Sequence, residues 1–77
     1  MPRITPISWR RLERVFLKAG LVFVRQEGTS HRFYSKPGME RPVVIPTYKE
    51  IDVEIIKANM RTAGMSRDEY FKLLGEI

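Results

Sequence analysis

The stretch LVFVRQEGTSHRFYSKPGMERPVVIP, residues 21–46, decides the fold of this chain. Three segments in it are rich in the β-branched and aromatic residues that favour strands: residues 21–26, 31–35 and 41–46. The segments between them, EGTS and KPGME, combine glycine or proline with polar residues and are typical of turns. Because short turns join neighbouring strands, the sequence predicts a three-stranded antiparallel meander.

Helical patterns flank the meander on both sides. Before it, apolar residues recur at helical spacing over residues 8–19, with a serine as N-cap. After it, the sequence predicts a helix over residues 52–63 and a short last helix from the capping box SRDE, residues 66–69, to about Leu74. The order α-β-β-β-α-α predicts an α+β fold with the helices packed on one face of the sheet. A chain of this size forms a single domain, residues 1–77.

Composition narrows the class of protein. Fourteen Lys and Arg against nine Asp and Glu give a net charge of +5 and a pI near 10.0. This balance favours a polyanionic partner such as RNA, DNA or an acidic protein surface, with simple solubility as the plainer explanation. With no cysteine and one histidine, we expect no disulfide, no metal and no cofactor. No segment resembles a membrane span or a secretory signal, so we expect a cytoplasmic protein without membrane contacts.

The first predicted helix has two distinct faces. Trp9, Leu12 and Phe16 recur at helical spacing and form its expected core face. At about 100° per residue, a row of cations falls on the opposite side: Arg10, Arg11, Arg14 and Lys18. These like charges repel one another, which is a cost to an isolated helix. The row is interpreted either as a phosphate-binding surface or as a solvated basic face.

The only histidine, His31, stands at the first position of the second predicted strand, beside the turn EGTS. Side chains alternate along a strand, so His31 and Phe33 share one face. A position next to a turn favours an accessible ring. From spacing alone, a histidine that only hydrogen-bonds a nearby carbonyl group explains this position somewhat better than a catalytic histidine does.

Several short motifs along the chain belong together. A first helix ends in KAG, FVRQEG and SH follow, the third strand ends in VVIP, and a helix ending in AG precedes SRDEYFKLL. Taken together, these motifs resemble the HicA (YcfA-like) toxins, which are messenger-RNA interferases of toxin–antitoxin pairs. The resemblance implies a fold like the double-stranded-RNA-binding domain and RNA cleavage without a ribosome. It also implies inhibition by a HicB-type antitoxin and a catalytic role for His31.

Three positions depart from the pattern of that family, and one of them is the start of the second helix, where DVEII stands in place of the usual glycine. Thr29 lies between Gly28 and Ser30, where the family usually has Gly-Ser-His without interruption. Tyr48 stands where many members have a second histidine, two residues after the proline that closes the third strand.

RNA cleavage by transesterification needs a base for the 2′-hydroxyl proton, an acid for the leaving 5′-oxygen, and cations for the phosphorane. We expect a metal-independent endoribonuclease, acting by transesterification or hydrolysis, with His31 as general base. Ser30 is expected to hydrogen-bond the imidazole or a phosphate oxygen, and Tyr48 is a candidate acid or positioning group. The expected contacts to RNA phosphates are the cations of the first helix, Arg25, Ser30, Arg32 and Lys49.

Two other functions remain open at this point. One is a non-catalytic RNA-binding module, because double-stranded RNA is recognised largely by shape, phosphates and 2′-hydroxyl groups. The other is a protein-interaction domain whose basic face binds an acidic partner. For a toxin, we expect the antitoxin to cover His31 and the basic first helix, since an inhibitor blocks substrate most simply by occupying the same cationic surface.

Overall fold

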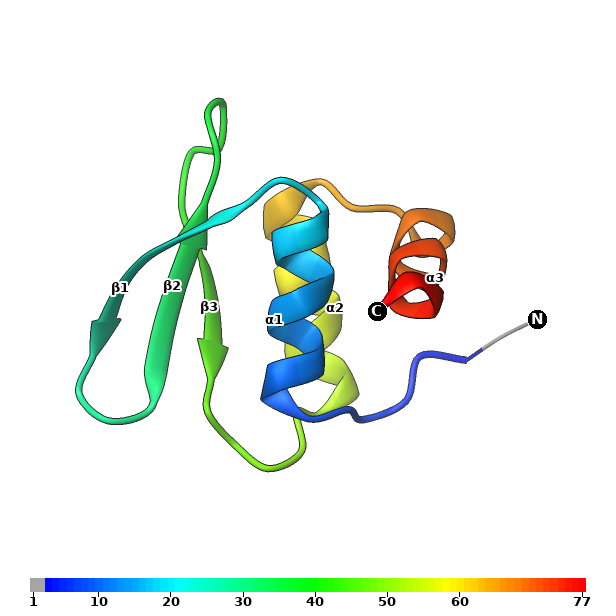
Figure 1. Ribbon diagram of the computed structural model, residues 1–77, viewed down its shortest axis with the longest axis horizontal. Helices are drawn as coiled ribbons and strands as arrows, with labels where there is room; N and C mark the ends of the chain where they lie inside the picture. Colours follow the sequence, from blue (N-terminus) through cyan, green and yellow to red (C-terminus); the bar gives the residue numbers. More distant parts are fainter. Residues whose placement is uncertain (1–2) are drawn as a thin grey trace.

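The computed structural model describes residues 3–77 as three helices and three strands (Figure 1). In chain order these are α1 (Trp9–Lys18), β1 (Val22–Glu27), β2 (His31–Ser35), β3 (Val43–Pro46), α2 (Val53–Ala63) and α3 (Arg67–Glu76). The predicted α+β fold and its element order are confirmed. Several boundaries differ by one or two residues: β1 covers residues 22–27 rather than 21–26, β3 begins at Val43 rather than at residue 41, and the last helix extends beyond Leu74 to Glu76. Residues 1 and 2 of the predicted domain lie outside the described residues.

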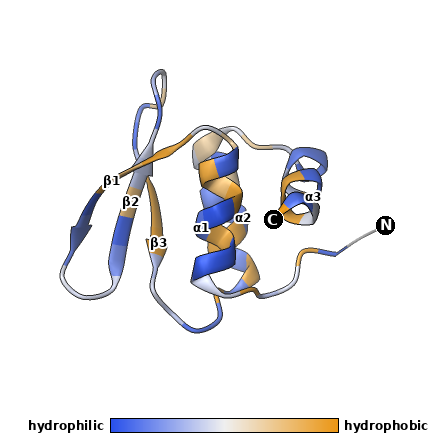
Figure 2. Cartoon of the chain, in the orientation of Figure 1, coloured by the Kyte–Doolittle hydropathy of each residue, from blue (hydrophilic) through white to orange (hydrophobic). Residues whose placement is uncertain are grey.

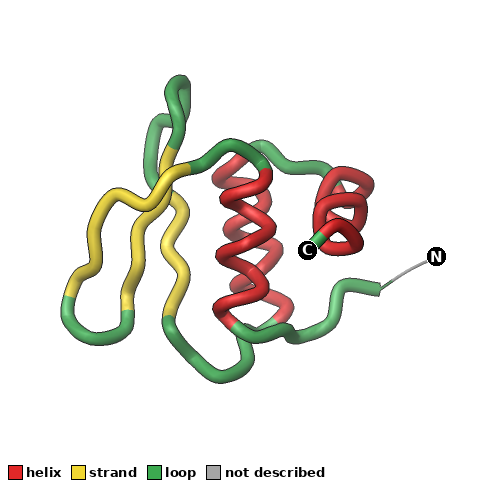
Figure 3. Tube along the Cα trace, in the orientation of Figure 1, coloured by secondary structure: helices red, strands yellow, loops and turns green. Residues whose placement is uncertain are grey.

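The sheet is an antiparallel meander with β2 in the centre (Figure 3). The first residue of β2, His31, is paired with Glu27 of β1 on one side and with Pro46 of β3 on the other. The register of β1 shifts between Phe23 and Arg25, where the strand contains a bulge. The central strand therefore begins between the ends of its two neighbours.

The helices cover only one face of the sheet. Tyr34, Val43 and Ile45 are completely buried and belong to the core that the helices complete. The alternating residues His31 and Phe33 point to the other face. Figure 2 shows apolar β3 beside the helices, whereas β1 lies farther out and is exposed along its whole length. The face of the sheet that carries His31 is therefore open, and we call it the open face.

The helix layer is tied together by the core residues of α1 and by the segment before it. Leu12 and Phe16 are fully buried, as their spacing predicts. Trp9, expected on the same core face, lies at the start of α1 and is only partly buried. Ile7 forms a β-bridge to Ile51, with the Ile51 N–H donating to the Ile7 carbonyl at 2.7 Å. This bridge holds the N-terminal segment against the loop that leads into α2.

Two of the three helix N-termini have a side-chain cap, and the third does not. The hydroxyl of Ser8 accepts the N–H of Arg11 at 3.3 Å, and the hydroxyl of Ser66 accepts the N–H of Glu69 at 3.1 Å. Asp52 occupies the same position before α2 but makes no side-chain capping hydrogen bond. Two of the caps therefore satisfy an N–H group that a helix end otherwise leaves to water.

This difference predicts unequal costs when the capping side chains are removed. Ser66→Ala is expected to lower the free energy of unfolding by about 1 kcal/mol, because an orphan N–H loses its acceptor. Asp52→Ala is the matched control and is expected to cost less, since only the attraction between its carboxylate and the helix dipole is lost. Urea denaturation of both variants measures the difference. Equal losses would contradict the capping geometry.

Candidate active site

His31 is exposed at the first position of β2, after a tight turn. Gly28 opens that turn with a φ of 63°, a left-handed conformation that glycine adopts without a steric cost. The hydroxyl oxygen of Ser30 lies 3.4 Å from Nδ1 of His31, so one ring nitrogen is oriented by its neighbour in sequence. Among the described residues, the second ring nitrogen, Nε2, has no hydrogen-bond partner. The ring is accessible, as its place beside a turn suggests.

The turn before His31 is attached to the loop that follows β3. The N–H of Thr47 donates to the carbonyl of Ser30 at 2.8 Å, and the Thr47 hydroxyl donates to the carbonyl of Thr29 at 3.3 Å. The inserted residue Thr29 therefore takes part in the attachment. The same loop carries Tyr48 and Lys49, which are both exposed. The structure thus brings these two candidates to the end of the sheet where His31 lies.

Arg25 and Glu27 share the open face with His31. Glu27 is the cross-strand partner of His31, and Arg25 is the partner of Phe33. The guanidinium of Arg25 donates through Nε to Oε2 of Glu27 at 2.8 Å and lies 4.2 Å from the ring centroid of Phe33. The structure therefore places Arg25 near His31, as the phosphate-contact hypothesis requires, but with a carboxylate already bound. Glu27 was not among the site residues predicted from the sequence.

Arg32 points to the covered face, where each of its three guanidinium nitrogens donates a hydrogen bond. It donates through Nε to the hydroxyl of Tyr34 at 2.9 Å, through Nη1 to Oε1 of Gln26 at 2.9 Å, and through Nη2 to Oε2 of Glu13 at 3.2 Å. The Tyr34 hydroxyl in turn donates to Glu13 of α1. These four residues form what we call the Arg32 network. The phosphate contact expected of Arg32 stays a prediction, and the structure places its guanidinium away from His31, because adjacent residues of a strand face opposite ways.

The pKa values of two members of the Arg32 network, Tyr34 and Arg32, differ from their ordinary values. Burial raises the pKa of Tyr34 to about 12, with the hydrogen bond to Glu13 adding to the rise and the hydrogen bond from Arg32 opposing it. The hydrogen bond to Tyr34 raises the pKa of Arg32, and burial opposes that change. The phenol therefore stays neutral well into the alkaline range.

The raised pKa of Tyr34 predicts a loss of stability at alkaline pH. An unfolded tyrosine has a pKa of about 10, so the folded state holds this proton more tightly. The resulting stabilisation is complete below about pH 10 and is lost as the pH rises toward about 12. In Tyr34→Phe this part of the pH dependence should be absent. Urea unfolding measured between about pH 9 and pH 12 compares the two proteins, and parallel curves would contradict the prediction.

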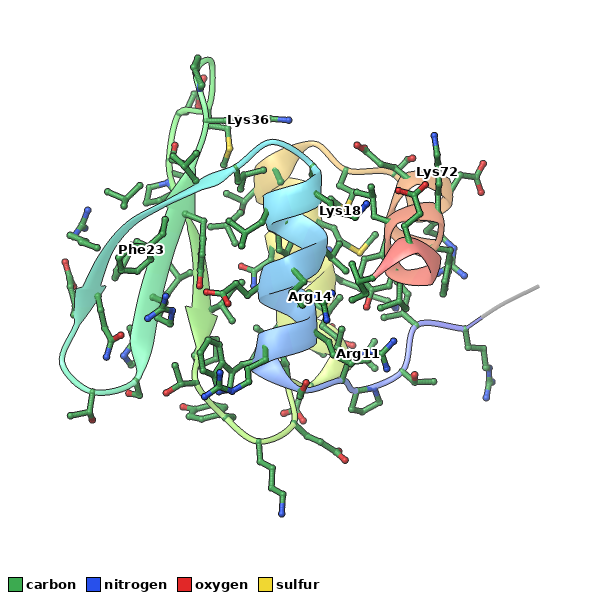
Figure 4. The ribbon with its side chains drawn as sticks, viewed as in Figure 1. Arg11, Arg14, Lys18, Phe23, Lys36 and Lys72 are labelled. Carbon is green, nitrogen blue, oxygen red and sulfur yellow. The ribbon has the colours of Figure 1, made fainter. Side chains whose placement is uncertain are left out.

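The predicted cations of the first helix are all exposed: Arg10, Arg11, Arg14 and Lys18. Figure 4 shows the last three spaced along α1. The ammonium of Lys18 contacts Oε1 of Glu76 in α3 at 3.4 Å, and the guanidinium of Arg10 lies 4.9 Å from the Trp9 ring centroid. Because α1 packs on the covered face, this row and His31 occupy different faces of the domain. The start of α1, whose first turn contains Arg10 and Arg11, lies at the same end as the β1–β2 turn (Figure 1).

His31 is an exposed residue at one end of the sheet and does not line the hollow at the other end of the domain. That hollow, of about 560 Å³, lies between the β2–β3 connection (residues 36–41) and the end of α2 (residues 61–64). Among residues 3–77, no group of three or more His, Cys, Asp or Glu side chains is placed to hold a metal ion. Within the same residues, no helix has the length and apolar character needed to cross a membrane.

Fold and site together define a class: a small α+β domain with one exposed histidine at the start of its central strand and helices on the other face. In a comparison with models of protein families, residues 9–65 match the family described as the HicA toxin of bacterial toxin–antitoxin systems. The chain belongs to this family, and its resemblance to HicA toxins is confirmed. The protein is thus a toxin of a toxin–antitoxin system, which suggests an antitoxin as its partner.

The family match covers α1, the whole sheet and α2, but not α3. The motif SRDEYFKLL therefore lies beyond the matched residues, although the sequence resemblance included it. Searches of curated proteins and of solved structures found no match. The assignment to the family rests on the part of the chain that contains His31.

Proposed function

We propose that this toxin is an endoribonuclease that cleaves messenger RNA without a ribosome and that a HicB-type antitoxin inhibits it. The single observation that carries the proposal is the position of His31. Its imidazole is exposed on the open face, one ring nitrogen is near Ser30, and the other is accessible. In a chain without cysteine, an accessible imidazole is the side chain best suited to move protons near neutral pH.

The proposed reaction is transesterification without a metal. The 2′-hydroxyl oxygen attacks the adjacent phosphorus atom, the bond to the 5′-oxygen breaks, and the products carry a 2′,3′-cyclic phosphate and a 5′-hydroxyl. His31 transfers a proton in this reaction, and Ser30 holds the imidazole in place. Lys49 and Arg25 are the cations at the same end of the sheet, and they stabilise the negative phosphorane.

The cations of α1 have a different part in the proposal. They lie on the helix layer, so they bind phosphates of the RNA away from the bond that is cut. The attraction between cationic side chains and the RNA backbone is largely independent of sequence and decreases with added salt. We therefore expect the α1 row to contribute to affinity rather than to the chemical step.

A non-catalytic RNA-binding module is the second candidate function. The observation in its favour is that the α1 row and His31 occupy different faces, so the row is able to bind RNA without presenting it to the imidazole. In that case the protein binds RNA but leaves the chain intact.

Incubation of purified protein with RNA in the presence of EDTA tests the proposed function. The expected result is cleavage at a rate that EDTA does not change, because the chemistry requires only side chains of the protein. The His31→Ala variant is purified separately by the same procedure. A contaminating nuclease is then recognised because it cleaves RNA in both preparations. Binding without cleavage would favour the RNA-binding module. If the protein neither binds nor cleaves RNA at low salt, both candidate functions are contradicted.

A further inference from the structure

Transesterification needs two proton transfers, and the strand register offers a partner for His31. Glu27, the last residue of β1, is directly opposite His31, the first residue of β2. Directly opposed residues in an antiparallel pair have Cβ atoms about 4.5–5.5 Å apart and side chains on the same face. Both side chains are exposed on the open face, so one ribose phosphate is able to reach both.

The carboxylate of Glu27 is held in place by a neighbour on its own strand. Nε of Arg25 donates to Oε2 of Glu27 at 2.8 Å, and the Arg25 guanidinium lies over the ring of Phe33. Phe33 is partly buried, so this stacking fixes the arginine against the sheet. The second carboxylate oxygen, Oε1, is left to accept a proton. On the other side, Ser30 orients His31 through Nδ1.

We propose that Glu27 and His31 form the acid–base pair of the reaction, an inference that rests on the proposed ribonuclease function. The carboxylate of Glu27 takes the proton of the 2′-hydroxyl as the oxygen–phosphorus bond forms. The imidazolium of His31 gives its Nε2 proton to the 5′-oxygen as the phosphorus–oxygen bond breaks. The pair then holds a neutral carboxylic acid and a neutral imidazole, and exchange with water restores both.

In the proposal, the two side chains take the roles that their charged forms suit. An ionised carboxylate only accepts hydrogen bonds, whereas an imidazolium donates from both nitrogens. The role of base, which the sequence suggested for His31, therefore passes to Glu27, and His31 supplies the acid that the sequence left open. Tyr48 and Lys49 are then needed for contacts to RNA and not for proton transfer.

The first test compares Glu27→Gln with a matched control, Glu40→Gln. Glu40 is an exposed carboxylate in the β2–β3 connection, far along the sheet from His31. Glu27→Gln is expected to lower kcat by about 10²–10⁴-fold, the range for loss of one proton-transfer group. RNA binding should not weaken, because the change removes a negative charge, and Glu40→Gln should cleave like the parent protein. If Glu27 had only a structural role, Glu27→Gln would instead lower the stability of the protein and its RNA binding together.

The second test assigns the roles with an RNA in which sulfur replaces the 5′-oxygen at the cut site. A thiolate leaves without being protonated, so loss of the acid matters little for this substrate. The proposal predicts that His31→Ala recovers most of its lost rate on the sulfur substrate, whereas Glu27→Gln does not.

The outcomes separate this inference from the proposed function. If the parent protein cleaves RNA and Glu27→Gln has the same kcat, the pair is wrong while the ribonuclease function stands. If the sulfur substrate restores the cleavage rate of Glu27→Gln but not that of His31→Ala, the assigned roles are overturned. If the parent protein cleaves no RNA, the proposed function and the pair both fail.

Discussion

His31→Ala is expected to slow RNA cleavage by about 10²–10⁴-fold, because the variant loses the group that transfers a proton in the chemical step. The ring is exposed at the start of β2 and takes no part in the core, so the free energy of unfolding should hardly change. Substitutions at exposed sites are usually within about 0.5 kcal/mol of the parent protein. The variant should therefore fold, bind RNA and fail to cut it.

Single-turnover cleavage of a labelled RNA measures this effect, together with RNA affinity by fluorescence anisotropy. Glu40→Gln serves as the control for a change at an exposed site away from the open face. An unchanged affinity with a much lower rate supports a role in chemistry. Cleavage by His31→Ala at the rate of the parent protein would show that another site, or another protein, cuts the RNA.

Glu13→Ala is expected to be the most destabilising of the substitutions considered, with a loss of about 2–3 kcal/mol in the free energy of unfolding. Oε2 of Glu13 accepts hydrogen bonds from both Arg32 and Tyr34. The Arg32 side chain is 23% exposed and Tyr34 is completely buried, so neither gains full contact with water when the acceptor is lost. A partly buried guanidinium without its carboxylate is costly, since its desolvation is no longer offset.

Glu13→Gln is the matched control for this prediction. The amide oxygen of glutamine still accepts hydrogen bonds, but it carries no charge, so the loss should be smaller than in Glu13→Ala. Thermal and urea unfolding at neutral pH compare the two variants. A change of less than about 0.5 kcal/mol in Glu13→Ala would mean that the Arg32 network does not connect α1 to the sheet in solution.

The order of elements was predictable because each signal acts locally. Ser8 caps α1 and Ser66 caps α3, as the sequence indicates. The strands were predicted to within about two residues, since β-branched and aromatic residues cluster between turn residues. The extension of the last helix to Glu76 was not predicted; in the structure Glu76 contacts Lys18 of α1.

The position of Arg32 was predictable in principle, because strand alternation places it opposite His31. Its partners were not, because Glu13 lies 19 residues earlier in the chain and meets it only when α1 packs on the sheet. The same limit applies to Trp9, whose helical spacing fits the core although it lies at the partly exposed start of α1. Periodicity gives the face of an element but not the depth of each residue.

The relation between Glu27 and His31 depends on strand register, which spacing alone leaves undetermined. Glu27 was predicted to lie in the turn, whereas β1 includes it as its last residue. The turn is thus one residue shorter than predicted, and this brings the carboxylate opposite the imidazole. A signal did exist, since Arg25 and Glu27 are two residues apart with opposite charges and share a face if the strand continues.

The central claim is that this toxin cuts RNA by proton transfer to and from the ribose phosphate, without a metal. Its most direct test is cleavage, in EDTA, of an RNA and of the same RNA with a single 2′-deoxy nucleotide at the cut site. The account predicts that the unmodified RNA yields a 2′,3′-cyclic phosphate and a 5′-hydroxyl, and that the deoxy site stays intact. Cleavage at the deoxy site, or products with a 3′-hydroxyl and a 5′-phosphate, would contradict it.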